Sequence, residues 1–282
     1  MIHKSSKLPV FSGFWSVQQC LFVLIFVGAL AGAGCSTQAT AESPSAGRAE
    51  VVTESDETPE RKRARIRIEL AMGYFEQGKT NIALDELKQA IAADPTFSDG
   101  YSLRGLVYMR LNDFAFAEES FNKALFYKPK DSNVLHNLGW LKCQQALYPQ
   151  SIQYFSQALS DPLYGERAKT LMAQGLCQAR AGMRSEAEAS LLKSYEFDAA
   201  NPVTGYNLAS LLYRKEDFVR AQFYIRRLNN SDLANSESLW LGIKVEKRLE
   251  NVEAMKQLAA QLEKRFPQST EAALYRRAAF NE

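Results

Sequence analysis

The chain has 282 residues, of which 46% are hydrophobic and 23% are charged, a composition that excludes a disordered or fibrous protein. Its 34 Lys and Arg nearly balance its 32 Asp and Glu, and two of the cations, Lys4 and Lys7, precede the first acidic residue, so the rest of the chain is neutral. A neutral chain has no general attraction for phosphate backbones, which argues against nucleic-acid binding as the main activity. The only two histidines are His3 and His136. They leave little room for a multi-histidine metal site or a catalytic triad, and we expect no metal and no cofactor.

The chain begins with a pattern typical of an export signal. A short basic stretch precedes the uncharged apolar segment 20–34, which is shorter than the roughly 20 residues of a membrane-spanning helix. The following Gly32-Ala33-Gly34-Cys35 resembles the lipobox of bacterial lipoproteins, although that motif usually has Leu in place of Gly32. The resemblance implies a signal peptide over residues 1–34 and a lipid on Cys35, and Ser36 favours the periplasmic face of the outer membrane. The alternative is an uncleaved N-terminal anchor, and both alternatives place the rest of the chain outside the cytoplasm.

The next segment is typical of a flexible tether. Residues 39–60 are rich in Ser, Thr, Ala, Glu and Pro and have no apolar periodicity, so they cannot bury a core. We expect the lipidated end and the tether to occupy residues 35–63. Such a tether lets the following domain reach a few tens of ångströms from an anchored end.

The rest of the chain repeats one unit six times. The segments that begin at Leu70 and Arg104 are alike, and their prolines, Pro95 and Pro129, lie 34 residues apart, which is the period of the tetratricopeptide repeat. This register predicts six helix-turn-helix units over residues 64–268, with starts near 64, 98, 132, 168, 202 and 235. Residues 269–282 are expected to form a capping helix, because a terminal repeat needs its outer face covered. The predicted fold class is all-α, a tetratricopeptide repeat superhelix.

Three positions of the unit support this register. Positions are counted from the first residue of each unit. The residues at positions 8 and 20 are small in all six units, and the residue at position 24 is large and apolar. The first helix of each unit is called helix A and the second helix B. Small residues where helix A crosses helix B allow the two helices to approach closely, and the bulky residue fills the space beside them. Position 8 holds Ala71, Gly105, Gly139, Gly175, Ala209 and Gly242; position 20 holds Ala83, Ala117, Ser151, Ala187, Ala221 and Ala254; position 24 holds Leu87, Phe121, Phe155, Leu191, Ile225 and Leu258.

Two cysteines lie in the repeats. Cys143 and Cys177 fall at nearly the same height on the A helices of the third and fourth units, and neighbouring helices bring facing Cα atoms within the range of a disulfide. An oxidising compartment would preserve such a bond; the alternative is two buried thiols. His136 lies on the same helix as Cys143, but no third metal ligand accompanies them.

The sequence carries no motif of an enzyme. It has no nucleophile elbow, no HExxH motif and no phosphate-binding loop, and carboxylate pairs such as Glu118 and Glu119 fall on exposed helical faces. We therefore expect no catalytic residue and no small-molecule substrate.

The inner groove of the superhelix is the candidate binding surface. Positions 2, 5, 9 and 12 of each A helix are expected to line it, and His136 occupies position 5 of the third unit. An apolar lining on a surface that faces water favours a protein partner, such as an amphipathic helix or an extended segment. The alternative is that some of these side chains pack against the neighbouring A helix or under the tether. The predicted partner-binding residues are Ile68, Met72, Phe75, Leu106, Met109 and Trp140.

Several segments resemble a known family. NLGWLKC from Asn137, SESLWLGIKVEKRLEN from Ser236 and RFPQSTEA from Arg265, together with the lipobox and the repeats, are similar to the PilF/PilW family of type IV pilus biogenesis lipoproteins, called pilotins. The chain departs from the expected pattern at Gly32 and at Gln261, which is position 27 of the last unit. The resemblance implies a non-enzymatic factor that binds the secretin subunit and promotes its outer-membrane localisation and multimerisation. The alternative is a periplasmic scaffold lipoprotein of another envelope machine, such as one that regulates cell-wall enzymes.

Overall fold

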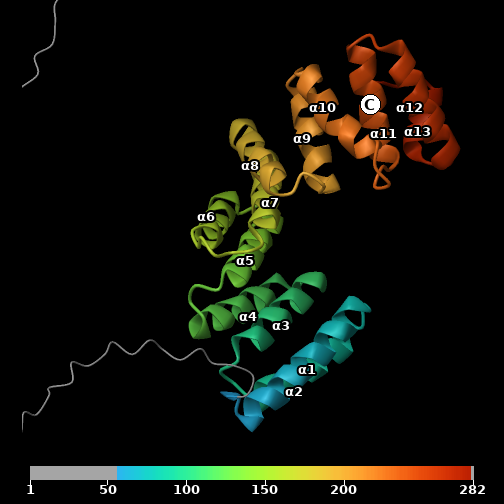
Figure 1. Ribbon diagram of the computed structural model, residues 1–282. Helices are drawn as coiled ribbons and strands as arrows, with labels where there is room; N and C mark the ends of the chain where they lie inside the picture. The colour runs from blue at the N-terminus through green and yellow to red at the C-terminus, as the bar shows by residue number, and fades with distance from the viewer. Residues whose placement is uncertain (1–55, 281–282) are drawn as a thin grey trace, which may run out of the picture. The chain divides into compact units, whose positions relative to one another are not determined.

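A computed structural model describes residues 56–280, which form thirteen α-helices and no β-strand (Figure 1). The predicted all-α class is confirmed. Cys35 and the predicted signal peptide lie outside the described residues. The helices are α1 (Pro59–Glu76), α2 (Thr80–Ala93), α3 (Ser98–Arg110), α4 (Phe114–Tyr127), α5 (Ser132–Gln144), α6 (Tyr148–Leu159), α7 (Arg167–Arg180), α8 (Arg184–Phe197), α9 (Pro202–Arg214), α10 (Phe218–Asn229), α11 (Ser236–Arg248), α12 (Val252–Arg265) and α13 (Thr270–Arg276).

The helices pair into six hairpins that follow one another in chain order (Figure 1). Each odd-numbered helix from α1 to α11 is the A helix of a unit and packs most extensively against the even-numbered B helix that follows it. The backbones of successive A helices approach each other closely, whereas successive B helices lie further apart and meet only through side chains, as Tyr195 of α8 meets Tyr224 of α10. The A helices are therefore closer together than the B helices, and they occupy the inner side of the stack.

The small residue at position 8 lies beneath the bulky residue at position 24. A methyl group added to Gly139 would come within 2.7 Å of the Phe155 ring, and one added to Gly175 would come within 2.7 Å of Leu191. Both distances are well below the carbon–carbon contact distance of about 3.5 to 4.0 Å. The small residues at position 20 of the first five units are also fully buried: Ala83, Ala117, Ser151, Ala187 and Ala221.

The sixth unit differs from this pattern. Its helix A begins at Ser236, one residue later than expected, so position 8 is the bulky Ile243 and position 24 is the small Ala259. These two side chains are 0% and 3% exposed and belong to one apolar cluster. The residues expected at the crossing still meet, because a methyl group added to Gly242 would come within 3.1 Å of Leu258. The corrected register also explains Gln261, which is exposed because the buried residue at position 27 is Leu262.

Two residues after the end of every helix A, one residue has a left-handed backbone conformation. Only two of these residues are glycine, so the sequence marks only two of the six turns strongly. A further left-handed residue, Ala278, follows α13, and α13 therefore ends in the same way as an A helix. The six turn residues are Gly78, Asn112, Ala146, Gly182, Glu216 and Glu250, with φ between 58° and 78°.

Helix α1 begins inside the segment that was expected to be tether. Thr58 caps the helix by accepting a hydrogen bond from the Arg61 N–H at 3.2 Å, and Pro59 occupies the first turn, where proline is well tolerated. The Arg61 side chain also pairs with Asp94, at the end of α2. The first turn is therefore held by its own cap and by the second helix of the unit.

Helix α13 covers the end of the stack. It contacts α11 and α12, and its Ala272 is fully buried. It ends at Arg276, so the capping helix is shorter than the expected 269–282. Beyond it, the Phe280 ring stacks on Trp240 with 5.3 Å between ring centroids.

His136 is buried between two neighbouring A helices rather than facing the groove. Its Nδ1 lies 2.8 Å from Thr170 Oγ1 of α7, and the residue is 7% exposed. Burial and the nearby charge of Lys169 lower the pKa of His136 to about 4, because both disfavour the charged imidazolium.

Cys143 of α5 and Cys177 of α7 are joined by a disulfide, with 5.8 Å between their Cα atoms. Both are buried beside Phe155 and Ala173, and Trp140 packs against this cluster. We propose that the native protein carries this bond in an oxidising compartment.

Replacing Gly139 by Ala tests the close helix approach. The added methyl group would force the Phe155 ring to move, so we expect the free energy of unfolding to fall by about 1–3 kcal/mol. Gly73→Ala is the control, because a methyl group at Gly73 meets nothing within 4 Å; it should be neutral or stabilising by up to about 1 kcal/mol. Chemical denaturation measures both values, and equal effects would contradict the packing.

Reduction of the protein tests the disulfide. The bond links residues separated by 34 positions, and loss of such a constraint on the unfolded chain should lower the free energy of unfolding by about 3 kcal/mol. Denaturant unfolding with and without a thiol reductant measures this, with the double variant Cys143→Ala/Cys177→Ala as an unresponsive control. Two free thiols in protein isolated from the periplasm would contradict the proposal.

Stability should depend on pH through His136, the only histidine in residues 56–280. The unfolded imidazole titrates near 6.5 and the folded one at about 4, so the unfolded state binds more protons between these values. The contribution is complete above pH 6.5 and is lost as the pH falls toward 4, by about 2 kcal/mol at pH 5. Unfolding of the protein and of His136→Gln at pH 7 and pH 5 tests this, and an equal pH effect in both proteins would refute it.

Candidate functional site

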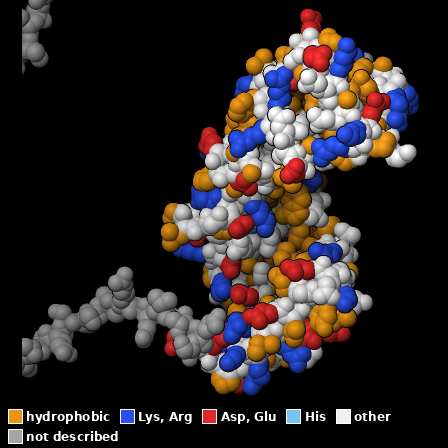
Figure 2. Space-filling model, turned by 45° about the vertical axis from the view of Figure 1, so that its right-hand side comes forward, with side chains coloured by type: hydrophobic (Ala, Val, Ile, Leu, Met, Phe, Trp, Pro, Cys, Tyr) orange, Lys and Arg blue, Asp and Glu red, His pale blue; other side chains and the backbone are white. Residues whose placement is uncertain are grey.

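The candidate site is the strip of apolar side chains on the inner side of α1, α3 and α5. We call it the groove face and define it by the six residues predicted from the sequence. Figure 2 shows a recess in the described part of the molecule where apolar side chains gather between charged ones. The groove face consists of Ile68, Met72, Phe75, Leu106, Met109 and Trp140.

The first part of the strip joins α1 to α3. Ile68, Phe75 and Leu106 are half-buried and pack against one cluster that includes Val107. Met72 is different, because it is 38% exposed. The structure therefore leaves Met72 as the most accessible apolar side chain of the groove face.

The second part joins α3 to α5. Leu106 and Trp140 also pack against the cluster that contains the buried Met109, and Trp140 reaches the disulfide cluster as well. Leu106 and Trp140 thus connect three apolar clusters along the A helices. Met109 is 9% exposed, so it supports the strip from below and presents little surface to a partner.

Two arginines cover the aromatic rings of the strip. The Arg110 guanidinium lies 3.6 Å from the centre of the Phe75 ring and donates a hydrogen bond to the Phe75 carbonyl. The Arg180 guanidinium lies 5.2 Å from the centre of the Trp140 ring. Cation–π contact holds both side chains over the groove face, and neither arginine forms an ion pair within residues 56–280.

These arginines were not predicted as site residues. Both occupy position 13 of their units, one residue beyond the last position considered for the groove. The signal is present in the sequence, because position 13 is also Arg214 in the fifth unit and α11 ends at Arg248 in a similar place. Cations near the C-terminus of a helix also interact favourably with its dipole.

The strip and its arginines are suited to binding a partner. Within residues 56–280, no group of three His, Cys, Asp or Glu side chains is placed to hold a metal ion. An apolar strip with two cations free of acidic partners is suited to an apolar segment that carries acidic side chains. None of the helices described is both long and apolar enough to cross a membrane.

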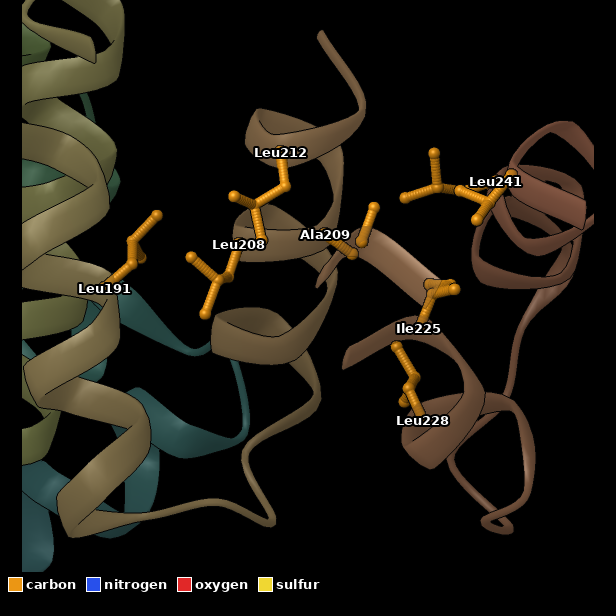
Figure 3. Packing of buried hydrophobic residues seen from close by; sticks show 9 residues of the cluster. Leu191, Leu208, Ala209, Leu212, Ile225, Leu228 and Leu241 are labelled. Carbon is orange, nitrogen blue, oxygen red and sulfur yellow. The ribbon is translucent and has the colours of Figure 1, made fainter. Parts of the chain in front are cut away.

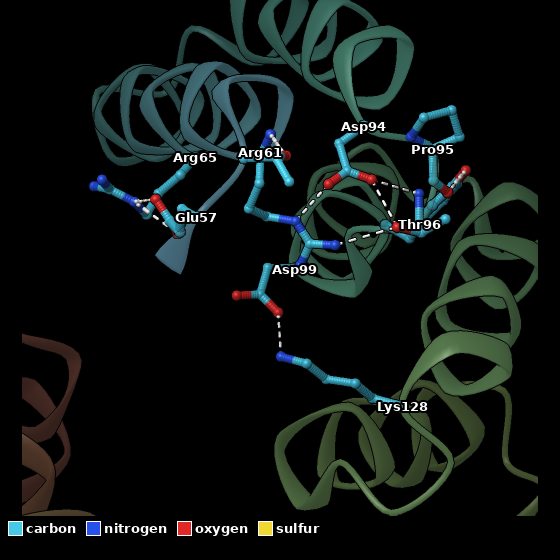
Figure 4. Close-up of polar contacts among 10 residues, drawn as sticks. Glu57, Arg61, Arg65, Asp94, Pro95, Thr96, Asp99 and Lys128 are labelled. Carbon is cyan, nitrogen blue, oxygen red and sulfur yellow. Dashed lines mark hydrogen bonds and ion pairs between the residues drawn. The ribbon is translucent and has the colours of Figure 1, made fainter. Parts of the chain in front are cut away.

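The polar cluster at the start of the stack is, by contrast, paired within itself (Figure 4). Arg61 bonds Asp94 and Thr96, and Lys128 pairs with Asp99 at 2.9 Å. Burial acts to raise the pKa of Asp94, but hydrogen bonds from Thr96 and Arg61 outweigh it and leave the pKa below its ordinary value. The cluster fixes the start of α1 to the end of α2 and is not a free binding site.

Comparisons with known proteins agree with the repeat architecture. A family model described as "TPR repeat" matches residues 73–112, and one described as "Tetratricopeptide repeat" matches residues 98–131. The chain is 28% identical over 204 residues to the type IV pilus assembly protein PilF of Pseudomonas aeruginosa, and the match covers 72% of this chain and 81% of that protein.

Solved structures extend the similarity to the arrangement of the helices. The crystal structure of PilW, described as a widely conserved type IV pilus biogenesis factor, matches with a TM-score of 0.68 and 28% identity over 75% of this chain and 97% of PilW. The structure of Pseudomonas aeruginosa PilF matches with a TM-score of 0.71 and 26% identity over 78% of this chain and 100% of PilF. Repeats, helix arrangement and sequence agree that the chain is a tetratricopeptide repeat protein that is similar to PilF and PilW.

Proposed function

We propose that the protein is a non-enzymatic pilotin of type IV pilus biogenesis, which binds a segment of the secretin subunit in the groove face and promotes its localisation and multimerisation in the outer membrane. The similar proteins PilF and PilW are described as type IV pilus assembly and biogenesis factors, which supports the process. The observation that carries the proposal is the apolar strip on α1, α3 and α5, with Met72 exposed and two arginines without acidic partners above it.

The proposed mechanism is tethering. Lipid chains on Cys35, outside the described residues, would hold one end of the protein at the outer membrane on its periplasmic face, and the tether would keep the groove face within a few tens of ångströms of the bilayer. A secretin segment bound there gains a high effective concentration at the membrane. Several acyl chains on one cysteine make the anchor durable, because a single chain binds membranes only marginally.

Replacing Met72 by Glu tests the groove face. Because Met72 is exposed, the introduced charge should leave the fold intact. In the complex, however, the charge would be buried against an apolar segment. We therefore expect the Kd for the purified secretin to rise at least tenfold, which corresponds to a loss of about 1.4 kcal/mol or more of binding free energy. Leu106→Glu is a poorer test, because Leu106 packs in two clusters and the variant would also destabilise the fold.

Ile66→Glu is the matched control. Ile66 lies on the same helix and is 45% exposed, but it is not part of the groove face. The Ile66→Glu variant should bind the secretin as the unmodified protein does. A deletion strain that expresses Ile66→Glu should form secretin multimers, whereas one that expresses Met72→Glu should not form them. Equal binding by both variants would refute the groove face, and recovery of cell-wall enzymes without secretin would favour the scaffold of another envelope machine.

A further inference from the structure

The fifth unit lacks a side chain that the preceding units have. Position 4 of helix A is buried in units two, three and four, where it is Tyr101, Leu135 and Leu171, with 6%, 6% and 7% exposure. In the fifth unit, position 4 is Gly205, in the first turn and a half of α9. Position 4 of the fifth unit therefore contributes no side chain to this place between the units.

The preceding units indicate what this space accommodates. Tyr101 stacks on Tyr127 with 5.8 Å between ring centroids, and its hydroxyl donates a hydrogen bond to the Pro95 carbonyl at 3.0 Å. Leu135 packs against Ala158 and Tyr164. The architecture thus supports a side chain between leucine and tyrosine in size at this place.

A pocket lies at the equivalent place in the fifth unit. It has a volume of about 290 Å³ and is lined by residues of α8, α9, α10 and the loops beside them. A methyl group added to Gly205 would meet nothing within 4 Å. We call it the Gly205 pocket; its walls include Tyr195, Gly205, Tyr224, Arg227, Leu228 and Leu233.

Packing does not require glycine at this position. Gly205 does not have a left-handed backbone, and alanine would fit without contact and would favour the helix. The glycines at position 8, by contrast, would clash if they carried a methyl group. Pockets also lie at the equivalent place in the third and fourth units, lined there by Leu135 and Leu171; in the fifth unit, glycine leaves this part of the wall without a side chain.

The chemistry of the walls is specific. Tyr195 and Tyr224 meet edge to face with 4.9 Å between ring centroids, and the buried Leu228 lies between α9 and α11 among the apolar residues in Figure 3. The Tyr195 hydroxyl is buried and has no hydrogen-bond partner within residues 56–280. The exposed Arg227 lies 5.8 Å from the centre of the Tyr195 ring and forms no ion pair in the same range.

We propose that the Gly205 pocket binds one aromatic side chain of a partner protein, with a carboxylate next to it that pairs with Arg227. The aromatic ring would take the place that Tyr101 fills in the second unit, and a polar atom on it would satisfy the Tyr195 hydroxyl. Buried single anchors of this kind dominate many protein interfaces. The pocket lies on α8, α9 and α10, apart from the groove face on α1, α3 and α5, so this inference does not depend on secretin binding.

N-acetyl-tyrosine and its amide are the probes that test the pocket. Titrated into the mature protein with isotope-labelled leucine methyl groups, N-acetyl-tyrosine should shift the signals of Leu228 and Leu233 with a Kd on the order of 1 mM. The amide, which lacks the carboxylate, should bind at least threefold more weakly. Arg227→Gln should remove this difference between the two probes.

Gly205→Leu fills the pocket from inside and should weaken binding of N-acetyl-tyrosine at least tenfold. Gly205→Ala should weaken it about threefold while raising Tm by about 3 °C, and it decides the test even where the leucine variant does not fold. Asn207→Leu is the matched control, because Asn207 is on the same helix but bonds only to the Val203 carbonyl; it should bind the probe normally.

Two results would overturn the proposal. The first is unchanged probe binding in Gly205→Ala and Gly205→Leu, or no shift of the Leu228 and Leu233 signals up to about ten times the expected Kd. The second is a shift of these signals with protein concentration alone, which would assign the pocket to a second copy of the chain. Neither result bears on secretin binding, which is measured with the Met72 variant.

Discussion

The close approach of the two helices in each hairpin is the constraint on which the rest of the structure depends. In the middle units, glycine at position 8 lets a phenylalanine or leucine at position 24 lie directly on the helix A backbone. This contact fixes the distance between helices A and B. Because each hairpin then has the same cross-section, the hairpins stack regularly, with the A helices closer together than the B helices. The groove face exists because the A helices are brought together in this way.

The sequence was sufficient to predict most unit boundaries because this constraint is local. Units two, three and five begin at the predicted residues 98, 132 and 202. Helix A of the last unit begins at Ser236, one residue beyond the predicted start near 235, and the predicted neighbours Gly242 and Leu258 still pack together there. The start of α1 was missed because the pairing of Arg61 with Asp94 joins residues far apart in the sequence.

The sequence could predict which side chains form the groove face, but not how deeply each of them is buried. Position within the unit shows which side of helix A a residue occupies, but it does not show how closely the next A helix covers it. His136 and Met72 both belong to positions expected to line the groove, yet the first is bonded to Thr170 of α7 and the second is exposed. The arginines above the strip were missed because cation–π contacts link residues of different units, as Arg110 with Phe75 and Arg180 with Trp140.

The glycines show why residue type alone cannot separate structural from functional positions. Gly139 and Gly205 are both buried, helical and in equivalent A helices, and the sequence gives them equal weight. A methyl group would strike the Phe155 ring at Gly139 and would meet open space at Gly205. The first glycine is therefore required by the contact that builds the stack. The second is not, and glycine destabilises a helix relative to alanine, so its presence is best understood through what the open space admits from outside the chain.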